Sequence, residues 1–557
     1  MTEPRSAPLS LPASVGVVNV GLPLFADAIR EQGAPVITVD WRVPAGGQPA
    51  AVAALGRLYG IHAERIEAAN AEVLRRLDQG IPLLTGVTTV ADAVPGLPDA
   101  TLLHCGPAIG YADAPDPLRR SMRAAAVAEG WAATAERADA QLARGEIELS
   151  PANAHCVVVP MATALGPSAP LYELVNEAGA TTAYAPISQG PGEVAWFGCV
   201  SEASIARLVF LREVAAPVIR AVVARTGPLD VLALAAQAVT MGDDVHVRTQ
   251  AATNLLIREW LPHLAELGGP ETAAFARFLA GNHLFFLTLA MGAARSLTEW
   301  AAQVPESSIV TTMARNGTTF GIRLAGSGRW FLDEAPEVGH ALYYPGQGPQ
   351  TSARDIGDSA VLELSGLGAA AAAGSPAVAQ LLGGQMREAA ALTRRLAAVC
   401  AGRSSRFKIP VLDNIGTPLG VDVRKVVELG SPPAVTTGIL HRTAGTGQVG
   451  SRHLYCEIKG LRATGQLTPS GFVVLKGSQA VLKERASAKQ YPNAIAPRRR
   501  VIEDGTLVQE GSHLVFRRDA EFSSPSAAAA VVHGGSANGL LAWKTKDGKT
   551  LKQLEAV

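Results

Sequence analysis

Four polar residues fall within six positions of the stretch MGDDVHVRTQ: Asp243, Asp244, His246 and Arg248. Apolar sequence at helical spacing flanks them on both sides, which places them at the junction of two predicted helices. Together these groups could bind a polar ligand, but an aspartate at this point could equally cap the second helix, leaving a surface histidine and arginine. A metal centre would need a further ligand that the spacing does not identify, so we predict no metal.

Two other polar pairs interrupt apolar sequence. Asn282 and His283 begin the stretch GNHLFFLTLAMG. A helix N-terminus suits an anion, although a buried, satisfied histidine is the commoner arrangement. Asp355 and Asp358 lie close together in ARDIGDSAVLE. Two such carboxylates could bind a cation, orient a basic group or differ in pKa, or they could simply form a turn.

Two glycine-containing segments could bring the backbone close to a ligand. Arg315 and Asn316 precede Gly317, and this triplet is predicted to begin a loop that leads into an alternating strand over 320–324. The later stretch TTGILHRTAGTGQVG contains the candidates His441, Gly445, Gly447 and Gln448. Backbone N–H groups of such a loop can hold phosphate or carboxylate, although the lysine of a Walker A loop is missing.

The composition is that of a folded, globular protein. The chain has 557 residues, of which 48% are hydrophobic and 18% charged, and this length suggests three or four domains. The five cysteines are scattered without a CxxC pair, which argues against a disulfide framework or a cysteine zinc site and fits a reducing compartment. Neither a secretory signal nor a membrane span is recognised, so we expect a cytoplasmic protein without membrane contact.

Four regions are predicted along the chain, and together they give a multidomain fold of the α/β and α+β classes. Residues 1–195 begin strand–helix–strand and form a Rossmann-like α/β region, but GxGxxG is missing. Asp40 could be a ribose-binding acid or a solvent-facing strand end, and no cofactor is predicted. Residues 196–300 are mainly helical, and residues 301–450 are mixed α+β with an alanine-rich helix in GLGAAAAAGSPAVA. Residues 451–557 form a small basic α+β domain.

Charge is distributed unevenly between these regions. Residues 1–450 carry 33 basic and 40 acidic side chains, a net charge of −7, whereas residues 451–557 carry 16 and 9, a net charge of +7. The shift marks a module boundary near residue 450. A net charge of zero for the whole chain gives no electrostatic argument for nucleic-acid binding.

Eight stretches in the same order, spanning residues 15 to 450, resemble the large-subunit family of oxamate carbamoyltransferase (AllG/YlbE-like). They are VVNVGLPLFADAIREQGAPVITVDWRVPAGG, TLLHCGPAI, LSPANAHCVVVPMA, MGDDVHVR, SSIVTTMARNGTTFGIR, DIGDSAVLE, GTPLGVDVRKVVE and TTGILHRTAGTGQVG. The resemblance implies that phosphate attacks the ureido carbonyl of oxalurate, giving carbamoyl phosphate and oxamate in purine and allantoin catabolism. It also implies a complex with an acyl-CoA-synthetase-like subunit and a smaller third subunit, and a homo-oligomer is an open possibility. A non-catalytic scaffold or ligand-binding subunit is the alternative.

The resemblance also suggests roles for the candidate residues. Arg315 would bind carboxylate or phosphate through two parallel hydrogen bonds, and Asn316 would hold the ureido group. The alternative for this triplet is a plain turn with a surface arginine. Donors aimed at the carbonyl oxygen would stabilise the charge of the tetrahedral intermediate. The expected catalytic residues are Arg315, Asn316, His441 and His246. The expected substrate- and phosphate-binding residues are Arg248, Asn282, His283, Asp355, Asp358, Gly445, Gly447 and Gln448. All are predicted to line one pocket.

One loop departs from the family pattern. In APISQGPGEVAWFG the family usually has an acid near Gln189, a lysine near Glu193 and an arginine near Trp196. Val247 and Thr249 likewise stand where the family tends to carry asparagines. The loop cannot contact an anion in the same way here, and a different ureido or amide substrate stays open.

The C-terminal region resembles a small uncharacterised domain at the ends of GIY-YIG nuclease-like and restriction-associated proteins. The resemblance rests on EIKGLRATGQLTPSGFVVLKGSQAVL and on the stretch that runs from LVFRRDAEF to KTL. Short strands, one helix over 524–532 and a closing strand at Trp543 are predicted. The net charge of +7 permits nucleic-acid binding, but we favour a solvated basic face on a structural appendage.

Overall fold

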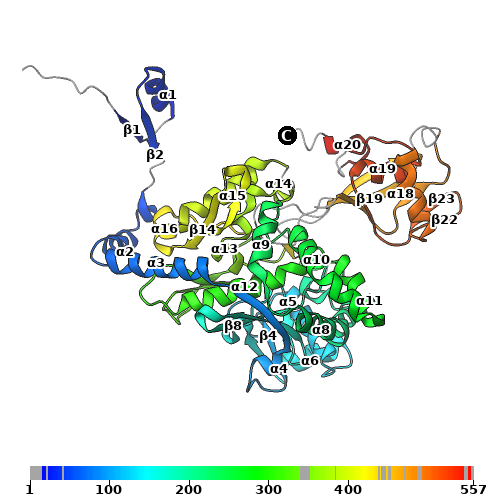
Figure 1. Cartoon of the computed structure of the whole chain (residues 1–557), viewed down its shortest axis with the longest axis horizontal. Helices are drawn as coiled ribbons and strands as arrows, with labels where there is room; N and C mark the ends of the chain where they lie inside the picture. Colours follow the sequence, from blue (N-terminus) through cyan, green and yellow to red (C-terminus); the bar gives the residue numbers. More distant parts are fainter. Residues whose placement is uncertain are drawn as a thin grey trace, which may run out of the picture. The chain divides into compact units, whose positions relative to one another are not determined.

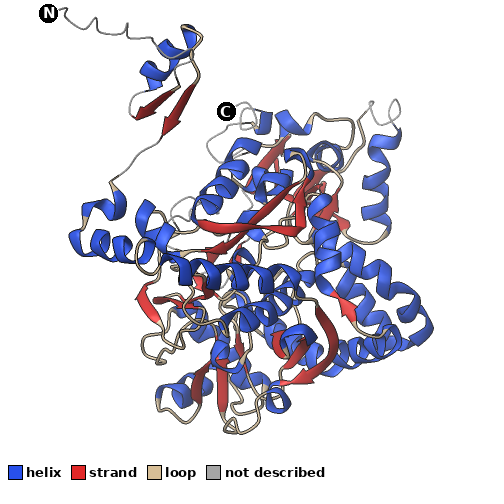
Figure 2. Ribbon diagram, turned by 60° about the vertical axis from the view of Figure 1, so that its left-hand side comes forward, coloured by secondary structure: helices blue, strands red, loops and turns tan. Residues whose placement is uncertain are grey.

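The computed structural model describes most of the chain (Figures 1 and 2). The described residues are 16–20, 23–39, 43–338, 352–382, 384–436, 439–440, 447–448, 453–468, 471–485, 492–544 and 550–552. The chain divides into two compact units. Unit 1 comprises Met1–Ala63 and Arg424–Pro432, and unit 2 comprises Glu64–Val423 and Pro433–Val557.

Unit 1 contains the predicted strand–helix–strand. Strands β1 (Val17–Val20) and β2 (Val36–Val39) are parallel, and α1 (Pro23–Glu31) connects them. Helix α2 (Pro49–Tyr59) follows, and α16 (Val423–Leu429) belongs largely to the same unit. The Rossmann-like expectation for 1–195 is not confirmed, because in the described part of the chain β1 and β2 form a two-stranded sheet of their own. Asp40 lies outside the described residues.

Unit 2 contains several small sheets, most of them antiparallel. The first, in the order β8-β7-β3-β9, comprises Thr181–Pro186, Pro170–Asn176, Pro82–Thr89 and Leu229–Asp230. The second, in the order β5-β4-β6, comprises Glu148–Pro151, Thr101–His104 and Ala164–Leu165, with β4 and β5 parallel. The third, in the order β12-β11-β10-β13, comprises Phe331–Glu334, Thr319–Leu324, Val310–Asn316 and Ile356–Gly357. Strands β14 (Cys400–Ile409) and β15 (Ile415–Val421) form a fourth.

Helices pack around these sheets. They are α3 (Ala63–Gln79), α4 (Val90–Ala93), α5 (Asp116–Ala128), α6 (Ala135–Ala143), α7 (Glu202–Phe210), the π-helix η5 (Leu211–Ala215), α8 (Ala216–Thr226), α9 (Val231–Thr240), α10 (Gln250–Leu267), α11 (Gly269–Ala280), α12 (Phe285–Ala302), α13 (Val361–Leu364), α14 (Pro376–Leu381) and α15 (Met386–Val399). Helices α7 to α12 confirm the mainly helical character predicted for 196–300.

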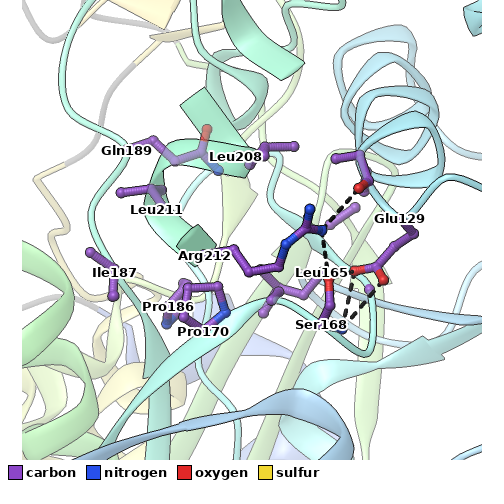
Figure 3. A pocket seen from close by; sticks show the side chains of 15 residues that line it. Glu129, Leu165, Ser168, Pro170, Pro186, Ile187, Gln189, Leu208, Leu211 and Arg212 are labelled. Atoms are coloured by element: carbon purple, nitrogen blue, oxygen red, sulfur yellow. Dashed lines mark hydrogen bonds between the residues drawn. The ribbon is translucent and has the colours of Figure 1, made fainter. Parts of the chain in front are cut away.

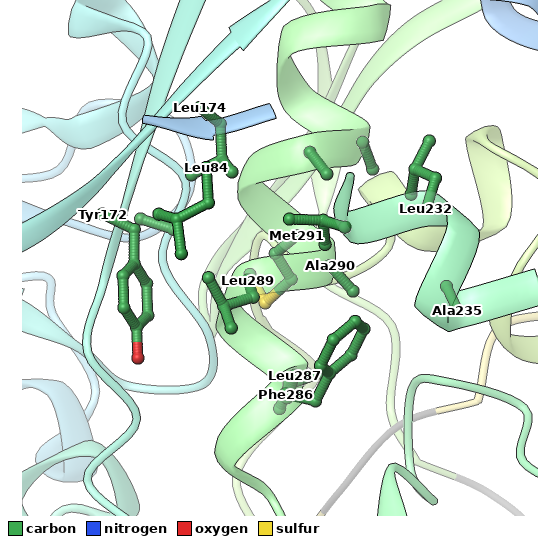
Figure 4. Packing of buried hydrophobic residues seen from close by; sticks show 14 of the residues in the cluster. Leu84, Tyr172, Leu174, Leu232, Ala235, Phe286, Leu287, Leu289, Ala290 and Met291 are labelled. Atoms are coloured by element: carbon green, nitrogen blue, oxygen red, sulfur yellow. The ribbon is translucent and has the colours of Figure 1, made fainter. Parts of the chain in front are cut away.

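Helix α12 is the central helix of the core. In Figure 4 its side chains lie between Leu84 and Leu174 of the first sheet and Leu232 of α9. The helix is buried on nearly every side, and each large apolar side chain contributes about 1.5–3 kcal/mol by leaving water. Among the described residues no single helix is both long and apolar enough to span a membrane, and α11 with α12 meets that test only as a pair bent by 85°.

One local prediction is wrong. The alanine-rich stretch after residue 366 forms two 3-10 segments, Gly368–Ala370 and Ala372–Gly374, before α14 begins. The single helix is interrupted because Gly368 has a positive φ of 60° and Ser375 caps the new helix at Pro376. Helices α5 and α6 are separated by a turn in which Gly130 has a positive φ.

The C-terminal module has its own hydrophobic core, in which Phe472 and Trp543 stack with ring centroids 4.4 Å apart. Its strands are β18 (His453–Ile458), β19 (Leu461–Thr468), β20 (Gly471–Val474), β21 (Gln479–Val481), β22 (Leu507–Glu510), β23 (His513–Phe516) and β24 (Ala520–Phe522). Helix α19 (Pro525–His533) confirms the predicted helix, and α18 (Pro492–Glu503) and α20 (Gly539–Ala542) are additional. Trp543 ends α20, and the predicted strand is reduced to bridges at Lys544.

Candidate functional site

Arg315 lies near the end of β10 rather than in a loop, and it is 1% exposed. Its Nε donates to Asp355 Oδ2 at 3.0 Å and its Nη2 donates to Asp355 Oδ1 at 3.2 Å. The edge that would bind a substrate anion through two parallel hydrogen bonds is therefore already occupied by Asp355. Its third nitrogen, Nη1, is buried and has no hydrogen-bond partner in the described part of the chain.

Asn316 serves the turn that follows it. Its Oδ1 accepts from the backbone N–H groups of Thr318 at 3.0 Å and Thr319 at 2.6 Å, and its Nδ2 donates to Pro107 O at 2.9 Å. These bonds close the β10–β11 connection around Gly317, whose φ is +84°. Both ends of the side-chain amide that was expected to hold a ureido group therefore bind other parts of the protein.

Asp358 follows β13, which pairs with β10 so that Arg315 stands opposite Gly357. Its Oδ1 accepts from Gly106 N–H at 2.7 Å, whereas Oδ2 is buried with no hydrogen-bond partner among the described residues. Gly106 approaches the β10 backbone so closely that a Cβ there would lie 2.4 Å from the carbonyl carbon of Arg315. Burial raises the pKa of Asp358 to about 7.

The stretch 243–248 forms a tight, strained turn. Asp243 accepts from Ala252 N–H at 2.9 Å and from Arg248 Nε at 3.1 Å. Ala252 lies in the first turn of α10, so Asp243 provides an acceptor for a backbone N–H group that has no partner within the helix. Asp244 accepts from the backbone N–H of Arg248 at 2.8 Å. Between them and the histidine, Val245 has a positive φ of 60°, a rare conformation for a β-branched residue that is characteristic of functional sites. Burial raises the pKa of Asp243 to about 7.

His246 is paired with Glu363, a residue of α13. The distance from His246 Nδ1 to Glu363 Oε1 is 2.9 Å, and the same oxygen accepts from Ala369 N–H at 3.0 Å and Thr436 N–H at 3.1 Å. Glu363 Oε2 is buried and, within the described ranges, has no hydrogen-bond partner. Burial opposes the charged imidazole, but Glu363 and then Asp244 more than offset it, so the pKa of His246 is raised.

These side chains form one cluster, which we call the 315 cluster: Asp244, His246, Arg315, Asp355, Asp358 and Glu363. Burial disfavours the charged guanidinium of Arg315, but Asp355, Glu363 and Asp358 outweigh burial and raise its pKa. Side chains from the stretches 243–248, 315–316 and 355–358 therefore lie close together, and the single pocket that all five stretches would line stays a prediction. Four carboxylates face one arginine and one histidine, so the cluster is rich in acid.

Sequence reasoning missed Glu363 and two arginines near this cluster. Arg295 of α12 and Arg323 of β11 both donate to Asn153 O, at 3.1 and 3.2 Å, and Arg295 also pairs with Glu299. Both arginines act electrostatically on Asp358. A usable signal was present, because Arg295 and Glu363 are charged residues inside mostly apolar stretches, and charged side chains are rarely buried unless they are paired.

The remaining candidates have structural partners. Asn282 Nδ2 donates to Ser188 Oγ at 3.2 Å, and Asn282 Oδ1 accepts from Leu284 N–H at 3.0 Å. The backbone carbonyl of His283 accepts from Thr249 Oγ1 at 2.7 Å, and burial lowers the pKa of its side chain. The first helix turn after these residues is therefore held by the chain itself.

In the loop that departs from the family pattern, Gln189 and Glu193 have partners within the chain, whereas the buried Nε1 of Trp196 has none among the described residues. Gln189 Oε1 accepts from Trp196 N–H at 3.0 Å, Trp196 is fully buried, and Glu193 accepts from Ser201 Oγ at 3.3 Å. The aromatic side chain that stands in the place of a family arginine thus belongs to the core.

Two candidates of the glycine-containing stretch, His441 and Gly445, lie outside the described residues. The other two, Gly447 and Gln448, form β17, which pairs with β16 (Ile439–Leu440). Across the described residues no group of three or more His, Cys, Asp or Glu side chains could hold a metal ion.

A separate cavity of about 40 Å³ lies beside the π-helix η5 (Figure 3). Arg212 donates to Ser168 Oγ at 3.0 Å, and that hydroxyl donates to Glu129 Oε1 at 2.8 Å. Its lining is mostly apolar and includes no member of the 315 cluster. The polar groups at its edge form hydrogen bonds with one another, so the cavity is a weaker candidate for a catalytic site than the 315 cluster.

Comparison with known proteins places this chain in a family. The sequence model described as "Oxamate carbamoyltransferase subunit AllG" matches residues 147–359, and that of a domain of unknown function, DUF4357, matches residues 454–555. The chain is 35% identical over 390 residues to Oxamate carbamoyltransferase subunit AllG of Escherichia coli (strain K12), covering 69% of this chain and 93% of that protein. It is 32% identical over 441 residues to the uncharacterized protein YahG of the same organism, covering 78% and 93%.

A solved structure is similar as well. The crystal structure of a conserved protein of unknown function from Enterococcus faecalis V583 matches with a TM-score of 0.67 and 32% identity, covering 70% of this chain and 94% of that chain. The family resemblance drawn from the sequence motifs is confirmed, and so is the one drawn for the C-terminal module. This chain belongs to the oxamate carbamoyltransferase subunit AllG family.

Proposed function

We propose that this chain is a carbamoyltransferase subunit in which phosphate cleaves oxalurate, or a related ureido acid, to carbamoyl phosphate and oxamate. The observation that supports this most is the 315 cluster. In a chain of this family, it combines a buried guanidinium nitrogen and two buried carboxylate oxygens that lack partners among the described residues. Buried polar atoms without partners also occur elsewhere in the described residues, for example Trp196 Nε1, but here three of them belong to charged side chains of one cluster, an arrangement that a ligand would satisfy.

The reaction needs a donor at the carbonyl oxygen. When a phosphate oxygen attacks the ureido carbon, negative charge develops on that oxygen, and a preorganised donor stabilises it. Arg315 Nη1 is such a donor, because its other two donating nitrogens are fixed by Asp355. The buried ion pair holds the guanidinium in place, so it needs little reorganisation during the reaction.

A proton must also move. As the C–O bond to phosphate forms and the C–N bond breaks, hydrogen phosphate loses a proton and the departing amide nitrogen gains one, so the reaction is balanced without an external acid. His246 can carry this proton, because its pKa is raised and Nδ1 is bound to Glu363. Nε2, the ring nitrogen that Glu363 does not engage, would exchange the proton.

The subunit would act within a complex. The relative's name as a subunit supports partner proteins, and we propose an acyl-CoA-synthetase-like subunit and a smaller third subunit in a cytoplasmic assembly. The alternative of nucleic-acid binding through the C-terminal module is not favoured. Exposed arginines of the module, among them Arg462 and Arg517, are paired with Glu457 and Glu510.

The test is a carbamoyl phosphate assay with oxalurate and related ureido acids, run on the purified chain with and without the products of neighbouring genes. Carbamoyl phosphate formation that needs this chain is the expected result. Formation that is unchanged by Arg315→Ala and by Glu363→Gln would assign this chain a scaffold role. No product from any ureido acid with the complete complex would refute the proposed reaction.

A further inference from the structure

We propose that Arg315 Nη1, Asp358 Oδ2 and Glu363 Oε2 form a subsite that recognises a carbamoyl group, the primary amide end of a ureido or amide compound. The inference rests on the proposed function for its substrate, and it adds which part of the substrate binds where. The amide nitrogen would donate its two hydrogens to the two carboxylate oxygens, and the carbonyl oxygen would accept from the guanidinium.

The fold brings these three side chains together. Arg315 stands opposite Gly357 in the β10–β13 ladder, so Asp358 follows at the adjoining position. Glu363 lies further along the chain, on the short helix α13, and this helix packs against β10. The pKa of Arg315 is raised by Glu363 and Asp358 after Asp355, which agrees with their proximity.

Each of the three side chains has one satisfied end and one unsatisfied end. Asp358 Oδ1 accepts from Gly106 N–H, Glu363 Oε1 accepts from His246 and two backbone N–H groups, and the Nε and Nη2 of Arg315 bind Asp355. The opposite atoms of all three have no partner among the described residues. An unpartnered buried polar atom costs about 1–3 kcal/mol, so a ligand that satisfies all three atoms would recover this cost three times.

The pattern of these atoms selects the ligand. A primary amide offers two N–H donors and one carbonyl acceptor, which is the complement of two carboxylate oxygens and one guanidinium N–H. A carboxylate or phosphate group has only acceptors in its ionised form and would face two carboxylates. An alkylammonium group could donate to both carboxylates, but it offers no acceptor to the guanidinium N–H, and its positive charge would repel the guanidinium. The neutral carbamoyl group is the group that fits all three atoms.

The test compares the binding of oxamate and pyruvate to the full chain by isothermal titration calorimetry at pH 8. The two ligands differ only in that the amino group of oxamate is a methyl group in pyruvate. A site built to hydrogen-bond an N–H group rejects an analogue without it by a factor as large as about 10⁴, so we expect oxamate to bind at least about 100-fold more tightly.

Glu363→Gln changes the unpartnered atom selectively. The Oε1 position accepts from His246 and two backbone N–H groups, which keeps the amide oxygen there and places the amide nitrogen at the former Oε2. Oxamate affinity should fall at least about 10-fold, the loss of one charged hydrogen bond, while pyruvate affinity stays within about 3-fold. Asp358→Asn is the second variant, with its oxygen held by Gly106 N–H. Glu306→Gln, at an exposed pair with Arg65, is the matched control and should change neither affinity.

The outcomes separate this subsite from the reaction. Preference for oxamate that collapses in Glu363→Gln and Asp358→Asn supports the subsite even if no carbamoyl phosphate is formed. Equal binding of the two ligands, no binding of either, or an unchanged preference in both folded variants overturns it. A complex that cleaves oxalurate with unchanged kcat/KM in Glu363→Gln would keep the proposed function and refute the subsite.

Discussion

Replacing Arg315 with methionine should destabilise the protein strongly. The sequence predicted that Arg315 begins a loop, but its side chain is 2% exposed and that of its partner Asp355 is 12% exposed. Removing one partner of a buried ion pair leaves an uncompensated charge, which typically costs about 3–5 kcal/mol. Asp358 and Glu363 would lose the same counter-charge, so we expect the upper half of this range for Arg315→Met.

A double-mutant cycle tests this reasoning. Arg315→Met, Asp355→Leu and the double variant are unfolded in urea, with the fluorescence of buried Trp196 and Trp260 reporting the transition of unit 2. If the two side chains act as a pair, the double variant should lose less unfolding free energy than the two single variants together, by at least about 2 kcal/mol.

The exposed pair Arg65–Glu306 provides the control. Its nitrogen and oxygen are 2.9 Å apart, close to the separation in the buried pair, but its side chains are 60% and 54% exposed. Solvent screening should reduce its coupling to about 0–1 kcal/mol. A loss below about 1 kcal/mol for Arg315→Met, or additive losses in the buried pair, would refute the account of Arg315 as a buried, charge-compensated side chain.

Further outcomes follow from the same site and from the module boundary. Arg315→Lys keeps the charge but loses the planar fork, so kcat/KM in the carbamoyl phosphate assay should fall about 30- to 1000-fold; wild-type turnover would remove Arg315 from the site. Asp358 has a pKa of about 7 in the folded chain and 3.8 in the unfolded chain. Between these pH values the folded chain keeps a proton that the unfolded chain loses, so stability falls as the pH rises, by up to about 1.4 kcal/mol per pH unit. The Tm of Asp358→Asn relative to wild type should therefore rise from pH 4 to pH 8, and a constant difference would contradict this. Gly106→Ala should destabilise more than Gly96→Ala by at least about 2 kcal/mol in urea unfolding, because both have positive φ but only the first Cβ meets backbone, at 2.4 Å. Removing residues 451–557 should leave the rest of the chain folded by circular dichroism, and aggregation of the truncated chain alone would move the boundary.

Elements with a strong local pattern could be predicted from the sequence. The alternation over 320–324 became β11, and the apolar helical spacing after residue 284 became α12. Residues 366–375 could not be predicted in the same way, because high alanine content favours a helix whereas a positive φ at Gly368 and the cap at Ser375 divide it.

The candidate site was predictable only in part. Asp243 and Asp244 were recognised because their chemistry is local: they bind backbone N–H groups within the next nine residues. His246 and Glu363 are 117 positions apart, and Arg315 and Asp355 are 40 apart. No short-range pattern encodes such contacts, which arise from the β10–β13 pairing and from α13 packing on β10. The neighbouring Gly317, a turn-forming residue, therefore favoured a loop at Arg315, although Arg315 lies in β10.

The acid excess of the 315 cluster constrains how the proposed substrates can be arranged. A phosphate charge about 4 Å from a carboxylate, at an effective dielectric constant near 20, is opposed by about 4 kcal/mol. Protonation of Asp358, whose pKa is about 7, removes one such repulsion near neutral pH. Arg295 and Arg323, which act on Asp358, supply positive charge next to it. We therefore expect the neutral carbamoyl group to bind between Asp358 and Glu363, and the anionic groups of the substrates to bind nearer to Arg295 and Arg323.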